Sequence, residues 1–178
     1  IIAIDPKFEI TPSGYVKTRF LDDKASAFLL LELLRYLKEQ NITPENNLKL
    51  IFSTYEEVGF GASNIPNINE MLAVDMGCIG LDLNCTEEQV SICAKDSGGP
   101  YDYDMITNLI NIAKEKNISY AVDIYPFYSS DATASLRAGN DIKAALIGTG
   151  VAASHGMERT HKHGLENTFN LILGYLNL

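Results

Sequence analysis

Six carboxylate or imidazole side chains stand at four places in the chain where a strand is expected to end or a helix to begin. They are Asp22, Asp23, Glu56, Glu57, Asp75 and His155. Carboxylates and imidazoles from separate segments are common ligands of zinc, cobalt and manganese in proteins. The adjacent Glu56 and Glu57 repel each other, and a nearby cation would offset that repulsion. Together the four places favour a metal site.

Each place also has a simpler interpretation. The aspartate pair could cap the helix that follows it, because aspartate is a common helix cap. The glutamate pair could be the solvated end of a strand, and Asp75 could cap the turn at Gly77. His155 could be structural, as a lone histidine often is. Each of these alternatives stays open for its own place. Taken together they are weaker, because all four places are expected at strand ends or in loops before helices, where one site could contain them all.

The elements that would position these residues follow from the apolar pattern of the chain. Helices are expected at residues 24–40, 103–116, 131–138 and 168–176. Strands are expected at residues 14–20, 49–55, 71–75, 90–94, 119–125 and 142–147. Strands separated by helices predict an α/β sheet with helices on both faces. In such sheets the ligand site lies beyond the carboxyl ends of the strands, where the acidic residues are expected.

The composition excludes several other classes of protein. The chain has 178 residues, of which 46% are hydrophobic and 21% charged, as in an ordinary soluble domain. A net charge of -9 argues against nucleic acid and anionic membranes as partners. No stretch is apolar enough to span a membrane, and no signal peptide is recognised. Three cysteines without a C-x-x-C pair predict buried free thiols and a reducing, cytoplasmic location.

Four motifs carry a family resemblance, and they occur in order over nearly the whole chain. They are Arg19–Ser26 (RFLDDKAS), Ser53–Gly59 (STYEEVG), Ala73–Asp75 (AVD) and Ser154–His155. Together they resemble the TET and glutamyl-aminopeptidase family of two-metal peptidases, and the Glu-Glu-Val-Gly element is the most specific of them. The resemblance implies a mixed α/β sheet with helices on both faces, the zinc-peptidase (phosphorylase/hydrolase-like) catalytic fold. It also implies peptide substrates that lose their N-terminal residue.

The same resemblance implies a role for each acidic or imidazole residue. Asp22 corresponds to the carboxylate that bridges two divalent metal ions, zinc or cobalt. Glu57 and His155 correspond to the other ligands of one ion, and Asp75 to a ligand of the second ion. Glu56 corresponds to the general base that takes a proton from water.

Further residues near these motifs have two interpretations each. The resemblance implies that Asp131 faces the free amine of the substrate, although it could equally cap the helix at residues 131–138. Glu158, Arg159 and His161 follow the predicted ligand His155. They could shape specificity, but we expect them to form a solvated ion cluster.

The chain also departs from the family pattern. The family has a further histidine ligand in an H-x-D motif upstream of Asp22, and this chain contains no H-x-D. The inserted β-rich domain that the family uses to oligomerise is also missing. The usual Asp-Asn-Arg-x-Gly is replaced by Asp22-Asp23-Lys24-Ala25-Ser26. We therefore expect residues 1–178 to be the catalytic domain of a longer homo-oligomeric protein, lacking its N-terminal part.

Other functions remain open at the level of sequence. A deacylase or a carboxypeptidase could use the same core, and a fragment lacking a metal ligand could be inactive. Glycosidases need two carboxylates on opposite sides of a bond, roughly 5–9.5 Å apart, which disfavours the adjacent Glu56 and Glu57. A serine hydrolase is disfavoured because no G-x-S-x-G motif is present.

Overall fold

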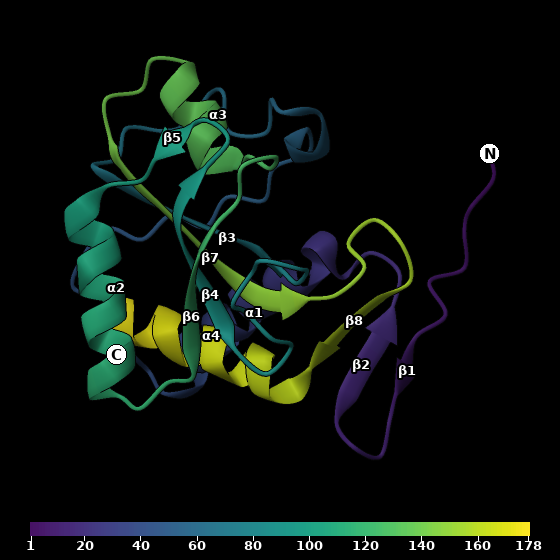
Figure 1. The fold of residues 1–178 in the computed structure, drawn as a ribbon. Coiled ribbons are helices and arrows are strands. Elements are labelled where there is room, and N and C mark those ends of the chain that lie inside the picture. Colours follow the sequence, from purple (N-terminus) through teal and green to yellow (C-terminus); the bar gives the residue numbers. More distant parts are fainter.

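A mixed five-stranded sheet forms the centre of the molecule. The computed structural model describes residues 1–178 and orders the strands β3-β7-β4-β5, with β6 pairing with β4 (Figure 1). The strands are β3 (Glu70–Cys78), β4 (Val90–Asp96), β5 (Gly99–Pro100), β6 (Tyr120–Ile124) and β7 (Lys143–Val151). β3 pairs with β7 in parallel, whereas β4 runs antiparallel to β7. β7 and β4 are almost entirely buried, which explains their near-continuous apolar sequences.

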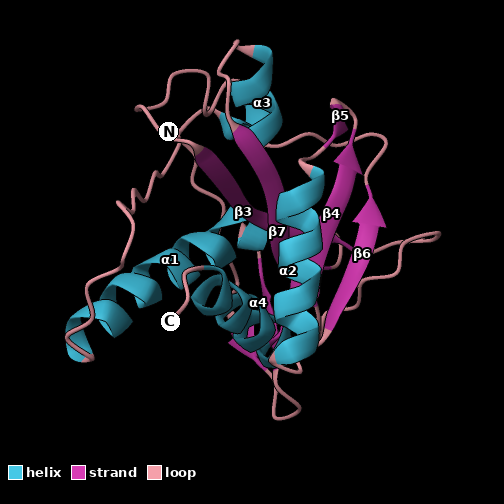
Figure 2. Cartoon of the chain, turned by 90° about the vertical axis from the view of Figure 1, so that its left-hand side faces the viewer, coloured by secondary structure: helices cyan, strands magenta, loops and turns pink.

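Four helices surround this sheet. They are α1 (Leu21–Glu39), α2 (Tyr103–Glu115), α3 (Asp131–Arg137) and α4 (Lys162–Tyr175). α4 contacts both α1 and α2, so these three helices form one layer against the sheet, while α3 packs separately against β3 and β7 (Figure 2). The expected α/β fold with a mixed sheet is confirmed. None of the helices has the length and apolar character that a membrane span needs.

Apolar residues at helical and strand spacing build the core. Leu29 and Leu33 of α1 and Leu109 of α2 are each at most 3% exposed, and they pack with Val90 and Ile92 of β4. Burial of such side chains is the main favourable term in folding, at roughly 1.5–3 kcal/mol for each one. The three cysteines are free and buried, as the sequence predicted.

A small antiparallel sheet lies beside the main one. β2 (Tyr15–Thr18) pairs with β1 (Glu9–Ile10) on one side and with β8 (Glu158–His161) on the other. The register places Thr18 opposite Glu158. This pairing joins the chain just before α1 to the chain just after the His155 loop, although the two are far apart in sequence.

The strand predicted at residues 49–55 is wrong. Residues 49–54 make no backbone–backbone hydrogen bond, and Ile51 and Phe52 are 41% and 49% exposed. An apolar run needs a neighbouring strand to complete its hydrogen bonds, and β3 pairs with β7 alone. Glu56 therefore begins a short 3₁₀ helix, η1 (Glu56–Val58), instead of ending a strand.

Close contact between β3 and β7 depends on Gly148. This residue pairs with Asp75, and a Cβ atom at Gly148 would overlap the backbone of Asp75 and Met76. We expect Gly148→Ala to lower the free energy of unfolding by about 2–3 kcal/mol, because backbone atoms cannot move aside as a flexible side chain can. The matched control is Gly80→Ala, where a Cβ would make only an ordinary van der Waals contact with a methyl group of Leu83, at 3.8 Å. It should change stability by less than about 0.5 kcal/mol in urea unfolding. Equal effects of the two substitutions would contradict this account.

Candidate metal centre

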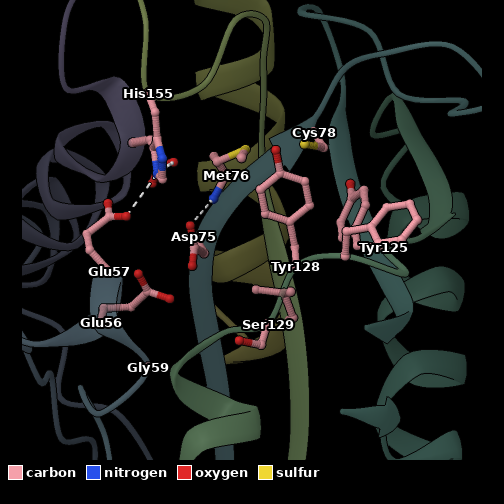
Figure 3. Close-up of a pocket in the computed structure, with 13 residues that line it drawn as sticks. Glu56, Glu57, Gly59, Asp75, Met76, Cys78, Tyr125, Tyr128, Ser129 and His155 are labelled. Carbon is pink, nitrogen blue, oxygen red and sulfur yellow. Dashed lines mark hydrogen bonds and ion pairs between the residues drawn. The ribbon is translucent and has the colours of Figure 1, made fainter. Parts of the chain in front are cut away.

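Asp22 stands at the centre of the candidate site. Its side chain is only 7% exposed, and its Oδ2 lies 3.2 Å from Nε2 of His155. The same oxygen accepts a hydrogen bond of 2.7 Å from Oγ of Ser154. Nε2 of His155 also lies 2.8 Å from Oε2 of Glu57 (Figure 3). Three predicted ligands, from α1, η1 and the loop after β7, therefore meet at one imidazole nitrogen.

A second group of carboxylates shares Asp22. One carboxylate oxygen from each of Asp22, Asp23 and Asp75 lies within 4.8 Å of the others. The peptide N–H of Met76 donates to Oδ1 of Asp75 at 2.7 Å, which fixes the orientation of that side chain on β3. Oδ1 of Asp23 is buried and has no hydrogen-bond partner. A buried anionic oxygen without a partner is costly, so this group fits a bound cation.

The electrostatics of this second group support the same interpretation. Burial, followed by repulsion from Asp75, raises the pKa of Asp23 well above its usual value. Burial, followed by repulsion from Glu56, raises the pKa of Asp75 in the same way. Without a cation, these carboxyl groups resist ionisation because their charges meet in a place of low polarity.

Glu56 and Glu57 project from η1 in different directions. Figure 3 shows Glu57 pointing toward His155, while Glu56 points toward the middle of the cavity. Burial raises the pKa of Glu56 to about 7, with further contributions from Glu57, Asp131 and Asp22. Burial also raises the pKa of Glu57. A carboxylate with a pKa near neutrality is suited to take a proton and return it.

The cavity beside these residues holds about 210 Å³. The acidic residues and His155 line one side, and Figure 3 shows aromatic and sulfur-containing side chains on the other. The largely apolar wall consists of Met76, Cys78, Tyr125, Phe127, Tyr128 and Leu146. No lysine or arginine lines the cavity. The space therefore suits a small molecule with an apolar group, held next to the carboxylates.

Asp131 lies near this cavity but does not line it. It is the first residue of α3, after the N-cap Ser130, so it does not itself occupy the cap position. Its Oδ1 is buried and has no hydrogen-bond partner. It faces Gly61, where a Cβ atom would collide with this oxygen. This oxygen therefore lies against Gly61 and not in the cavity.

A third group of ligand-type side chains, Glu88, His161 and His163, is already hydrogen-bonded. Nε2 of His161 lies 2.9 Å from the carbonyl oxygen of Ser13. Nδ1 of His161 accepts a hydrogen bond of 3.2 Å from the peptide N–H of His163. Because both ring nitrogens of His161 are engaged, this group is not a candidate metal site.

Comparison with known proteins identifies the family. A family model described as M42 glutamyl aminopeptidase matches residues 1–171. The chain belongs to the M42 glutamyl aminopeptidase family. It is 46% identical over 177 residues to YhfE of Bacillus subtilis (strain 168), a protein provisionally assigned as an aminopeptidase. That match covers 98% of this chain and 51% of YhfE, so the chain spans about half the length of this M42 relative.

Solved structures agree with this membership. The TET1 peptidase of Pyrococcus horikoshii has a TM-score of 0.80 and 25% identity, over 94% of this chain and 51% of that one. A TET aminopeptidase from the marine sediment archaeon Thaumarchaeota archaeon SCGC AB-539-E09 has a TM-score of 0.86 at 17% identity. That match covers 94% of this chain and 50% of the archaeal chain, and it shows that the fold is shared.

The sequence analysis misplaced several residues beside this candidate site. Glu158 was expected in a solvated ion cluster, but it is 1% exposed and accepts hydrogen bonds from three backbone N–H groups, so that prediction is wrong. His161 is also buried, and Arg159 instead forms an exposed ion pair with Glu87. The alternation along β8 carried a signal, because strand periodicity places Glu158 and Thr160 on the same, inward face.

The raised pKa of Glu56 predicts a pH dependence of stability. Between its unfolded value of 4.5 and about 7, the folded chain binds more protons than the unfolded chain. Stability therefore falls as the pH rises through this window. In metal-free protein we expect Glu56→Gln to melt above the wild type at about pH 8, with the gap closing toward about pH 5. Thermal unfolding of both proteins checks this, and a gap that does not depend on pH would contradict it.

Proposed function

We propose that the full-length protein is a two-metal aminopeptidase that removes N-terminal residues from peptides. The observation that carries the proposal is the convergence of Asp22, Glu57, Asp75 and His155 beside Glu56 and a cavity. Membership of the M42 family supports the same activity. The reaction class is metal-assisted hydrolysis of an amide bond.

The side chains present fit one divalent cation and part of the coordination of a second. Asp22, Glu57 and His155 would hold one cation, and Asp22 with Asp75 would hold the other. Asp23 adds an unpartnered buried oxygen beside the second position. Carboxylates with a single imidazole are compatible with zinc, cobalt or manganese, and the family resemblance favours zinc or cobalt. A bound cation would offset the burial and the repulsion that raise the pKa values of Asp23 and Asp75.

Glu56 would move the proton in this reaction. When bound, the cations supply Lewis acidity toward the scissile carbonyl and toward water. The carboxylate of Glu56 would accept a proton from the attacking water and then donate it to the nitrogen of the leaving amine. The η1 turn separates this role from that of its neighbour, because it directs Glu57 to His155 and Glu56 to the cavity (Figure 3).

The cavity wall favours an aminopeptidase over a carboxypeptidase. A carboxypeptidase must bind the terminal carboxylate of its substrate, usually with arginine or lysine. The cavity has neither, whereas the carboxylates that line it suit a protonated amine. The test is to compare an unblocked peptide with its N-acetylated form in the presence of zinc or cobalt. Cleavage of the unblocked peptide alone supports the proposal. Equal cleavage of both peptides would favour a carboxypeptidase or an endopeptidase, and release of acetate would favour a deacylase.

We further propose that residues 1–178 are the catalytic domain of a homo-oligomer located in the cytoplasm. The TET1 peptidase of Pyrococcus horikoshii assembles into a tetrahedron or a large octahedral shell. This chain spans about half of that protein's length. We propose that the remainder of the full-length protein includes a domain used in assembly. Three buried free thiols suit a reducing compartment.

Substitution of the two adjacent glutamates should separate their roles. We expect Glu56→Gln to keep the fold and the bound metal but to lose about 10²–10⁴-fold in kcat, because an amide cannot accept the proton. Glu57→Gln should lower metal affinity together with rate, because it removes a ligand charge. The measurement is peptide hydrolysis alongside metal analysis of both variants. Near-full activity of Glu56→Gln would show that Glu56 is not the base.

The metal content of the 178-residue chain should show that the site for the second cation lacks part of its ligands. Three side chains would hold the first cation, whereas the second would depend on aspartates alone. After dialysis against metal-free buffer, we expect one retained zinc or cobalt per chain, or fewer. Elemental analysis is the measurement, with His155→Ala as the control that should retain none. Two tightly held ions in the unmodified chain would refute this expectation.

A further inference from the structure

We propose that Glu158 is a positioning residue that holds the two ligand-bearing segments, residues 20–22 and 153–155, in the geometry that binds the cation. This inference rests on the proposed function, because it assigns Glu158 a task toward the metal ligands Asp22 and His155. It concerns a residue that does not line the cavity and is not itself one of the proposed metal ligands.

The carboxylate of Glu158 accepts hydrogen bonds from both segments. Its Oε2 accepts from the peptide N–H groups of Leu21 and Asp22, the latter at 3.1 Å. Its Oε1 accepts from the peptide N–H of His155 at 2.9 Å. Both oxygens are thus occupied by backbone donors, and the residue is 1% exposed. One buried anion therefore links the backbone of two proposed ligands that are 133 positions apart in sequence.

The two segments need such a link because both contain unfavourable backbone conformations. Phe20 has a φ of 68°, and Ala153 and His155 have φ values of 59° and 63°. Residues other than glycine avoid this left-handed region, and they occupy it when the surrounding structure fixes them there. Hydrogen bonds to a charged acceptor are stronger than those to a neutral one, so Glu158 is suited to fix these turns.

The strand pairing of β8 places Glu158 for this task. Thr18 of β2 lies opposite Glu158, two residues before Phe20. The isolated bridge between Ala152 and Arg159 fixes the other segment beside β8. Each segment thus follows directly after a paired strand. The side chain of Glu158 lies between the two turns and is hydrogen-bonded to both.

Glutamine cannot replace this carboxylate. In Glu158→Gln one oxygen becomes an NH₂ group, which would face either the N–H of His155 or the N–H groups of Leu21 and Asp22. One segment therefore loses its acceptor while the side-chain volume stays the same. The matched control is Thr160→Val, on the same strand as Glu158. It removes a buried hydrogen bond of 2.7 Å from the Thr160 hydroxyl to the carbonyl oxygen of Gly150 on β7. The side-chain hydrogen bond of Thr160 goes to neither ligand segment.

The experiment combines a cobalt titration with hydrogen exchange, both on the full chain. In the metal-free protein, Glu158→Gln should accelerate amide exchange in peptides that cover residues 20–23 and 153–157. Its cobalt affinity should fall by about 10–100-fold, the usual cost of losing a group that orients metal ligands. Thr160→Val should leave the cobalt affinity and the exchange of both segments unchanged.

Unchanged cobalt affinity and unchanged exchange in Glu158→Gln would overturn the proposal. An equal loss of affinity in Thr160→Val would also overturn it, because the effect would then be general destabilisation. If the wild type bound no cobalt, the proposed function would fail, and exchange alone would decide whether Glu158 orders the two segments. Should Glu158→Gln not fold, Glu158→Asp takes its place. It keeps the charge but is one methylene too short, and the same two measurements then decide.

Discussion

Mutual repulsion among the carboxylates gathered around Asp22 is the constraint that the surrounding structure has to meet. Asp22, Asp23 and Asp75 approach one another in a largely buried place, and Glu56 and Glu57 add charge from η1. Such an arrangement opposes folding unless protons or cations neutralise it. The raised pKa values of Asp23, Asp75, Glu56 and Glu57 express that opposition. A rigid structure that holds these carboxylates together therefore favours the binding of a cation or of protons.

The mixed sheet provides most of that rigidity. Asp75 sits within β3, a nine-residue strand paired along its whole length with the buried β7. The loop after β7 then presents His155 to Asp22 and Glu57. Because β3 and β7 run in parallel, the loop after β7 leaves the sheet at the same edge as the end of β3. Two of the proposed ligands, Asp75 and His155, thus lie on or closely follow strands whose positions are fixed by the core.

The small sheet adds a second kind of control, over backbone conformation. β2 and β8 bring Glu158 between the turn before α1 and the turn at His155. Both turns contain residues with positive φ values, and a buried carboxylate offers them strong acceptors. The backbone of the proposed ligands Asp22 and His155 is therefore held by hydrogen bonds to a residue outside the cavity, an arrangement that is common around metal centres. A chain that spans about half the length of YhfE supplies these hydrogen bonds and the four proposed ligands.

The sequence by itself determined the α/β class, the positions of most helices and strands, and the residue types that gather at the site. Local spacing carries that information, since helical and strand periodicities appear along the chain. It could not determine that residues 49–54 lack a strand partner, that Asp23 leaves an oxygen unpaired, or that Glu158 is buried. Each of these depends on which distant segment lies opposite. Only the tertiary structure decides that, because hydrogen-bond partners and burial are set by contacts between segments that the linear pattern does not relate.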